Sequence, residues 1–343
     1  MPLRSVHLFA AATLSLLLPS AAGSAQRPPA SPAPLVPVAD IPLPGAAVRF
    51  DYQSFDPTTG RLYIAHMNDD HLVVFDVRSR RVLANLPGFT RVHGVLAVPA
   101  LHRVYASATG DHALVALDSR TLRIIGHAAP IAYPDGIACA PVQRELFVSD
   151  EHGGTDAVVN ADATRVLASI PLGGGAGNTV YDPATGHILV AVHHQNQLAV
   201  IDPATRQILT RAPLPGIDDP HGIALDAADG LAFVAGEGNH SLAVVRLRDL
   251  RMLGTPLVVG DDPDVLAFDP GLRLLYVSAE SGQVTVFHLS GSTLSPVGSV
   301  DMPHAHTVAV DPATHLVYFP LQDVNGHPIL RILRPASIPA SAR

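Results

Sequence analysis

The chain alternates short apolar runs with polar turns, and one such unit recurs along it. The unit is clearest at residues 219–226, where Asp-Pro-His-Gly precedes an apolar run that Asp226 ends. Variants begin at Tyr133, Asp262 and Ala305. A short apolar run that ends in a turn predicts a β-strand. Each copy therefore places a titratable His or Asp where a strand begins.

The recurring strand has a nearly constant period. Its copies end at Asp56, Val98, Ala140, Asp182, Asp226, Asp269 and Asp311. These positions are about 42 to 44 residues apart, within the range of β-propeller blades. Further strands follow each copy, for example at residues 61–65, 72–76 and 166–172. The pattern predicts an all-β, seven-bladed propeller with four antiparallel strands per blade. A β-sandwich is the structural alternative, but it does not require so constant a period.

The two ends of the repeat array predict how the ring closes. The seventh repeat runs out after its third strand, near residues 329–333. Residues 38–45 resemble the fourth strand at residues 209–216. We expect the N-terminal strand to complete the last blade, because this covers strand edges that would otherwise be exposed.

The first 25 residues resemble a secretory signal. Arg4 precedes an apolar run at residues 8–18, which is too short to span a bilayer, and Gly23 and Ala25 suit cleavage. We expect residues 1–25 to be a signal peptide, which predicts a periplasmic or secreted protein without a membrane span. Residues 26–37 read as a Pro-rich linker, residues 38–336 as the propeller and residues 337–343 as a C-terminal tail.

Composition narrows the function. Hydrophobic residues make up 48% and charged residues 15%, which predicts a large core. The net charge is −8 and the chain contains no Lys. A nucleic-acid partner is not expected, because such a surface needs a basic stripe. Schiff-base chemistry through a Lys is also excluded.

The repeats resemble a known family. Elements such as Leu62-Tyr63-Ile64, and Asp-x-x-Thr turns such as residues 202–205, are similar to the YVTN-type propellers, also called YncE-like. The resemblance covers about residues 38–336 and implies the propeller fold. It does not imply one activity, because the family is functionally mixed.

Two sets of side chains should converge on one face of the propeller, at the mouth of its channel. The first set stands where each inner strand begins: Asp51, His93, Asp135, Gly177, His221, Asp264 and His306. The second set follows each second strand: Met67, Thr109, Glu151, His193, Glu237, Glu280 and Gln322. Mixed imidazoles and carboxylates suit divalent metals and acid–base chemistry. The alternative is a wet channel lined by polar residues without function. Ionisable groups packed this closely, however, need pairing, protons or a metal.

A weaker resemblance concerns the sequence Pro-x-Gly-Ile-Ala. It occurs at residues 134–138, followed by Glu151, and at residues 220–224, followed by Glu237. These elements are similar to those of virginiamycin B lyase and gluconolactonase-like propellers. The similarity implies a divalent metal and a His that acts as base.

Together these patterns predict an exported propeller that binds a divalent metal ion, or a small polar ligand, at the channel mouth. If it is an enzyme, it is a metal-assisted hydrolase or lyase. The expected catalytic residues are His221, Glu237, Asp264 and Glu280, with His306 as a second candidate base. The expected metal ligands are His93, His193, His221 and His306.

The ordinary His pKa of about 6.5 then predicts that metal affinity falls below that pH. The alternative is a non-enzymatic module that binds a protein or a polysaccharide. The opposite face carries ordinary turn residues, such as those at 56–60, and is expected to be inert.

Overall fold

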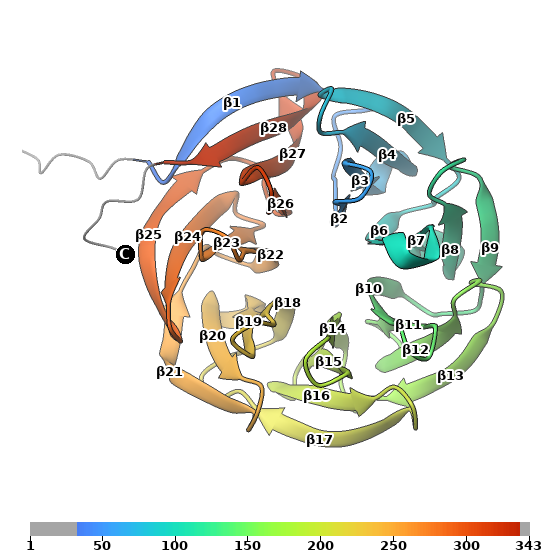
Figure 1. Ribbon diagram of the computed structural model, residues 1–343, viewed down its shortest axis with the longest axis vertical. Coiled ribbons are helices and arrows are strands. Elements are labelled where there is room, and N and C mark those ends of the chain that lie inside the picture. Colours follow the sequence, from blue (N-terminus) through green and yellow to red (C-terminus); the bar gives the residue numbers. More distant parts are fainter. Residues whose placement is uncertain (1–32, 337–343) are drawn as a thin grey trace, which may run out of the picture. The chain divides into compact units, whose positions relative to one another are not determined.

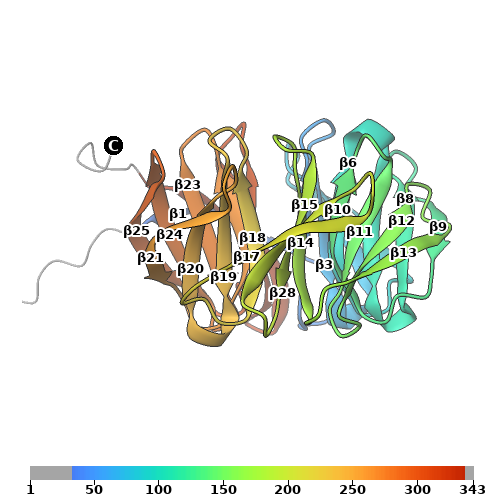
Figure 2. The same ribbon diagram turned by 90° about the horizontal axis from the view of Figure 1, so that it is seen from below.

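The computed structural model describes residues 33–336, which form seven four-stranded antiparallel sheets around a common centre (Figure 1). The predicted seven-bladed propeller is confirmed. Figure 2 shows the same ring from the side, with the connecting loops on its two faces. The predicted signal peptide, the beginning of the predicted linker and the C-terminal tail lie outside the described residues.

The first four blades each consist of consecutive strands, ordered from the centre outward. Blade 1 contains β2 (Gln53–Asp56), β3 (Arg61–His66), β4 (His71–Asp76) and β5 (Arg81–Pro87). Blade 2 contains β6 (Val92–Val98), β7 (Arg103–Ala108), β8 (Ala113–Asp118) and β9 (Ile124–Ala128). Blade 3 contains β10 (Pro134–Ala140), β11 (Glu145–Asp150), β12 (Thr155–Asn160) and β13 (Val166–Pro171). Blade 4 contains β14 (Ala176–Asp182), β15 (His187–Val192), β16 (Gln197–Asp202) and β17 (Gln207–Pro213).

The remaining three blades follow the same plan, except that the last takes its outer strand from the N-terminal end. Blade 5 contains β18 (Pro220–Asp226), β19 (Leu231–Gly236), β20 (Ser241–Arg246) and β21 (Arg251–Val258). Blade 6 contains β22 (Pro263–Asp269), β23 (Leu274–Ala279), β24 (Gln283–Ser290) and β25 (Thr293–Asp301). Blade 7 contains β26 (Ala309–Asp311), β27 (Leu316–Val324), β28 (His327–Pro335) and β1 (Leu35–Pro42).

The helical segments of the described residues are short 3₁₀ turns. They are η1 (Met67–Asp69), η2 (Pro99–Leu101), η3 (Thr109–Asp111) and η4 (Glu237–Asn239). No helix in residues 33–336 is both long and apolar enough to cross a membrane.

The core lies between neighbouring blades. The second and third strands, such as β3 and β4, are buried almost throughout, whereas the outer strand β5 alternates between exposed and half-buried positions. Strands covered on both faces read as continuous apolar runs, which explains the apolar pattern of the sequence. The second-strand tyrosines pack fully buried in this core: Tyr63, Tyr105, Tyr276 and Tyr318.

The N-terminal strand closes the ring, as expected. Strand β1 pairs antiparallel with β28, and the backbone N–H of Leu43 donates to the carbonyl of Pro328 at 2.9 Å. The side chains of Asp40 and Arg331 form an ion pair at 2.6 Å across the two strands. The strand begins at Leu35, before the expected start at Val38, because its pairing continues to Pro335 at the end of β28.

A β-bulge positions the first set of side chains. In five of the inner strands the pairing register shifts where a channel residue stands, as between Pro220 and Ile223 in β18. A bulge interrupts the ladder and can re-aim a side chain. Here the shift spans residues that line the channel, among them His93, Asp135, His221 and Asp264.

The glycine of the Pro-x-Gly-Ile-Ala sequence has a packing role. A Cβ atom on Gly222 would collide with the carbonyl of Asp264 in the next blade, and one on Gly136 with the side-chain oxygen of Asn178, also in the next blade. Only glycine lets neighbouring inner strands approach this closely. The packing of the ring therefore accounts for the glycine of this repeated sequence.

Candidate functional site

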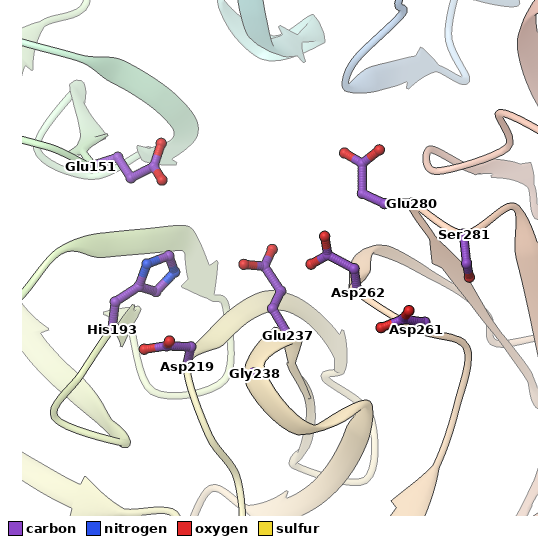
Figure 3. A pocket seen from close by; sticks show the side chains of 9 residues that line it. All are labelled: Glu151, His193, Asp219, Glu237, Gly238, Asp261, Asp262, Glu280 and Ser281. Carbon is purple, nitrogen blue, oxygen red and sulfur yellow. The ribbon is translucent and has the colours of Figure 1, made fainter.

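Two cavities of about 470 and 290 Å³ lie at the face where the inner strands begin. Both are lined by Glu151, Glu237, Asp262 and Glu280. Figure 3 shows the larger cavity, with Glu151 across the opening from Glu237 and Glu280. Members of both predicted sets therefore converge at the channel mouth, whereas Thr109 and Gln322 line neither cavity.

A histidine-rich group forms where blade 4 meets blade 5, from His193, His221 and Glu237. His193 follows β15, His221 lies in β18 and Glu237 begins η4. His193 Nε2 lies 3.0 Å from His221 Nδ1, which in turn lies 3.4 Å from Glu237 Oε1. One potential ligand atom of each residue lies within 4.8 Å of the other two. This arrangement can hold a single metal ion.

The other edge of the His221 ring faces the channel. His221 Nε2 lies 3.0 Å from the Tyr52 hydroxyl, 3.5 Å from Asp264 Oδ1 and 3.8 Å from Asp135 Oδ2. A proton on Nε2 faces these acceptors and leaves the Nδ1 lone pair directed at the histidine-rich group. Polar partners on the far nitrogen are the usual way in which a ligating imidazole is oriented. Because Nε2 is held by these partners while Nδ1 is directed at His193 and Glu237, the geometry favours His221 as a ligand over His221 as a base.

An aspartate-rich group is formed by Asp51, Asp264 and His306. These residues come from blades 1, 6 and 7, which are neighbours in the ring (Figure 1). Their potential ligand atoms also lie within 4.8 Å of one another. The structure thus places the expected ligands His193 and His221 in one group and His306 in the other.

Two expected site residues lie at the mouth but belong to neither group. Glu280 forms an ion pair with Arg49 at 2.5 Å. His93 contacts the carbonyl oxygen of Arg91 through Nδ1 at 2.7 Å and the Tyr133 hydroxyl through Nε2 at 3.3 Å. Both nitrogens of His93 are therefore already engaged.

Burial controls the charge state of the site. It raises the pKa of Glu237 to about 8, with the neighbouring carboxylates of Asp262 and Glu151 adding to the effect. It also raises the pKa of Asp51 to about 7. The same loss of solvation lowers the pKa values of His221 and His306 to about 3. At neutral pH the imidazoles are neutral and can donate lone pairs, while the carboxyl groups retain protons that a cation can replace.

Sequence reasoning missed Arg49, Tyr52 and Tyr133. A third periodic set would have revealed two of them, because side chains two apart lie on the same side of a strand. The residues two positions before the first set are Arg49, Arg91, Tyr133, Gly175, Asp219, Asp262 and His304. Arg49, Arg91 and Tyr133 line the smaller cavity, Asp219 lines the larger one, and Asp262 lines both. Tyr52 follows the first-set residue Asp51 directly.

No protein-family model matches the chain, and a search by sequence among curated proteins finds no match. The fold and the site define a β-propeller with ionisable groups at its channel mouth, and solved structures share this fold. Hydrazine synthase of Kuenenia stuttgartiensis aligns over 86% of this chain and 97% of its own, with a TM-score of 0.72 and 13% identity. Virginiamycin B lyase of Staphylococcus aureus aligns over 86% and 98%, with a TM-score of 0.71 and 12% identity. At these identities the likeness shows the fold alone.

Proposed function

We propose that the protein is an exported β-propeller of the YVTN type that binds a divalent metal ion at its channel mouth and uses it in lyase or hydrolase chemistry. The observation that carries the proposal is the histidine-rich group, whose potential ligand atoms lie within 4.8 Å of one another. Two imidazoles and a carboxylate, with a cavity beside them for a further ligand, are a donor set of catalytic zinc sites. Their geometry and chemistry fit such an ion.

In the metal-free site, the imidazoles already have the charge state and the orientation that metal binding requires. Burial lowers the pKa values of His193 and His221, so both rings are neutral at neutral pH. The far edge of His221 is held by the Tyr52 hydroxyl at 3.0 Å, which fixes the ring orientation. The ion, when bound, would act as a Lewis acid towards a carbonyl group or a bound water molecule.

Glu151 is the best-placed proton acceptor. Its carboxylate lines both cavities and faces Glu237 across the opening (Figure 3). Glu280 also lines both, but its carboxylate is held by Arg49 at 2.5 Å. Burial raises the pKa of Glu151, which brings it closer to the range in which a carboxylate exchanges protons at neutral pH.

A lyase reaction is the first candidate. The structural neighbour virginiamycin B lyase is a lyase on this fold. The cavity beside the histidine-rich group, about 470 Å³, has the size of a small-molecule site. Its walls carry mostly carboxylates, so a polar substrate suits it better than an apolar one.

Metal analysis of purified protein tests the proposal. After chelation, wild-type protein is titrated with Zn²⁺ beside His193→Ala and a matched control, His127→Ala, whose imidazole is exposed on the outer strand β9. We expect His193→Ala to lose one zinc equivalent, with an affinity loss above about 100-fold, the upper end for loss of an outer-shell partner. The control should bind as the wild type does. Equal zinc binding by all three proteins contradicts the proposal. Zinc binding without turnover of any substrate would support the alternative of a non-enzymatic module.

A further inference from the structure

The aspartate-rich group shares no residue with the histidine-rich group. Asp264 lies in β22, whereas Asp51 and His306 lie just before β2 and β26, the innermost strands of the two neighbouring blades. Only 2% of Asp51, 5% of Asp264 and 4% of His306 is exposed to solvent. Three ionisable side chains are thus enclosed together at the inner end of the mouth.

Two atoms of this group have no hydrogen-bond partner among the described residues. They are Asp264 Oδ1 and His306 Nε2, and both are buried. His221 Nε2 lies 3.5 Å from Asp264 Oδ1, but this imidazole is neutral at neutral pH and brings no positive charge. Buried polar atoms are nearly always paired, so unpaired ones indicate an ion or a water molecule that completes the site.

Local charge favours a cation over a further anion. Asp51 and Asp264 bring two carboxyl groups whose protons a cation can replace, and neutral His306 adds a lone pair and no positive charge. The guanidinium of Arg49 interacts electrostatically with both aspartates, but it also forms an ion pair with Glu280 at 2.5 Å, so one guanidinium faces three carboxyl groups. A divalent cation would balance the two aspartates, because buried charges are tolerated only when they are paired or bind a metal.

We propose that Asp51, Asp264 and His306 form a second divalent-cation site, separate from the histidine-rich group and suited to a harder ion such as Mn²⁺. Two carboxylates and one imidazole are an oxygen-rich donor set, which suits Mn²⁺ better than the nitrogen-rich set of His193 and His221 does. The His221 ring lies between the two groups, with Nδ1 directed at one and Nε2 at Asp264 of the other. The mouth would then hold a two-ion centre. The second site goes beyond the proposed function, because its ligands do not depend on the first ion.

Separate substitutions in the two groups test the inference. Chelated wild-type protein is titrated with Mn²⁺ and with Zn²⁺, and bound metal is counted by elemental analysis. We expect two equivalents of divalent metal, one of which prefers Mn²⁺. Asp51→Asn should lose one equivalent and at least about 100-fold in Mn²⁺ affinity, by the same reasoning as for a lost ligand. It should keep zinc at the histidine-rich group. Asp301→Asn, which alters an exposed carboxylate at the end of β25, should keep both equivalents.

The fold of the variants is checked by thermal unfolding without metal. Asn has the shape of Asp without its charge, so metal-free Asp51→Asn should be at least as stable as the wild type. Asp264→Asn provides a second test should Asp51→Asn fail to fold. Unchanged Mn²⁺ affinity and stoichiometry in a folded variant overturn the second site. The two proposals fail differently. Loss of all metal in Asp51→Asn, together with normal binding in His193→Ala, contradicts the first site and supports the second.

Discussion

Zinc binding at the histidine-rich group should release about one proton at neutral pH, and Glu237 should supply it. Burial raises the pKa of Glu237 to about 8, and Asp262, Glu151, Glu280 and Asp219 add to the effect. Protons and metal compete for this carboxylate. The imidazole of His221, whose pKa burial lowers to about 3, has no proton to release in this range.

The size of the effect follows from the pKa. A carboxyl group with a pKa of about 8 is roughly 0.9 protonated at pH 7 and roughly 0.5 protonated at pH 8. Zinc should therefore release these amounts of proton, and its affinity should fall roughly tenfold for each pH unit below 8. The sequence alone predicted a fall below about 6.5, the ordinary His value. With the pKa of Glu237 at about 8, we expect the fall in zinc affinity to begin near pH 8, and we assign it to this carboxylate and not to a histidine.

Calorimetry in buffers of different ionisation enthalpy measures the released protons directly. The titration is best done in Asp51→Asn, because Asp51 also has a raised pKa, of about 7. Glu237→Gln should bind zinc more weakly and release almost no proton. The reasoning is refuted if zinc binds at pH 7 without proton release, or if Glu237→Gln releases as much as its parent.

Three further predictions concern the ring and the metal-free site. Deletion up to residue 45 should lower the melting temperature of the propeller, because it removes β1 and exposes the edge of β28, whereas deletion up to residue 34 should not; equal melting temperatures contradict the closure. Gly222→Ala should cost about 1–3 kcal/mol of unfolding free energy in denaturant titrations. Gly175→Ala, whose Cβ would lie 3.2 Å from the nearest atom, should cost less, and the reverse order contradicts the packing role. Because the folded state raises the pKa of Glu237, this group stabilises the metal-free fold fully below its ordinary pKa of 4.5, and the contribution is lost as pH rises through about 8. Added zinc, or the substitution Glu237→Gln, should flatten this dependence of the unfolding free energy on pH. Identical pH profiles with and without these changes would count against the prediction.

The architecture could be predicted from the sequence because each blade of a propeller is a repeat of nearly constant length. The spacing of the strand ends predicted the number of blades, and the match of residues 38–45 to a fourth strand predicted that β1 closes the ring. Burial between blades makes the same positions apolar in each repeat. The blades could therefore be predicted without knowing which distant residues contact one another. The resemblance to YVTN-type propellers led to the same fold, while membership of that family stays a prediction.

The site was predicted only in outline, for a physical reason. A period tells which residues face the channel, but not which of them meet across it. Tyr52 of blade 1 reaches His221 of blade 5 at 3.0 Å, and no spacing along the chain encodes that contact. The orientation of each imidazole matters in the same way. His221 joins a ligand group, whereas His93, from the same set, contacts the Tyr133 hydroxyl. The pKa values depend on burial, which the sequence does not reveal at single positions.

An anomalous-difference map at the zinc absorption edge, from crystals grown with Zn²⁺, tests the central claim most directly. The account predicts a peak about 2.0–2.2 Å from His193 Nε2, His221 Nδ1 and a carboxylate oxygen of Glu237. That peak should be missing in His193→Ala crystals grown in the same way. Zinc peaks found only elsewhere, for example between the exposed side chains of His240 and Asp261, which form a contact at 2.8 Å, would contradict the claim.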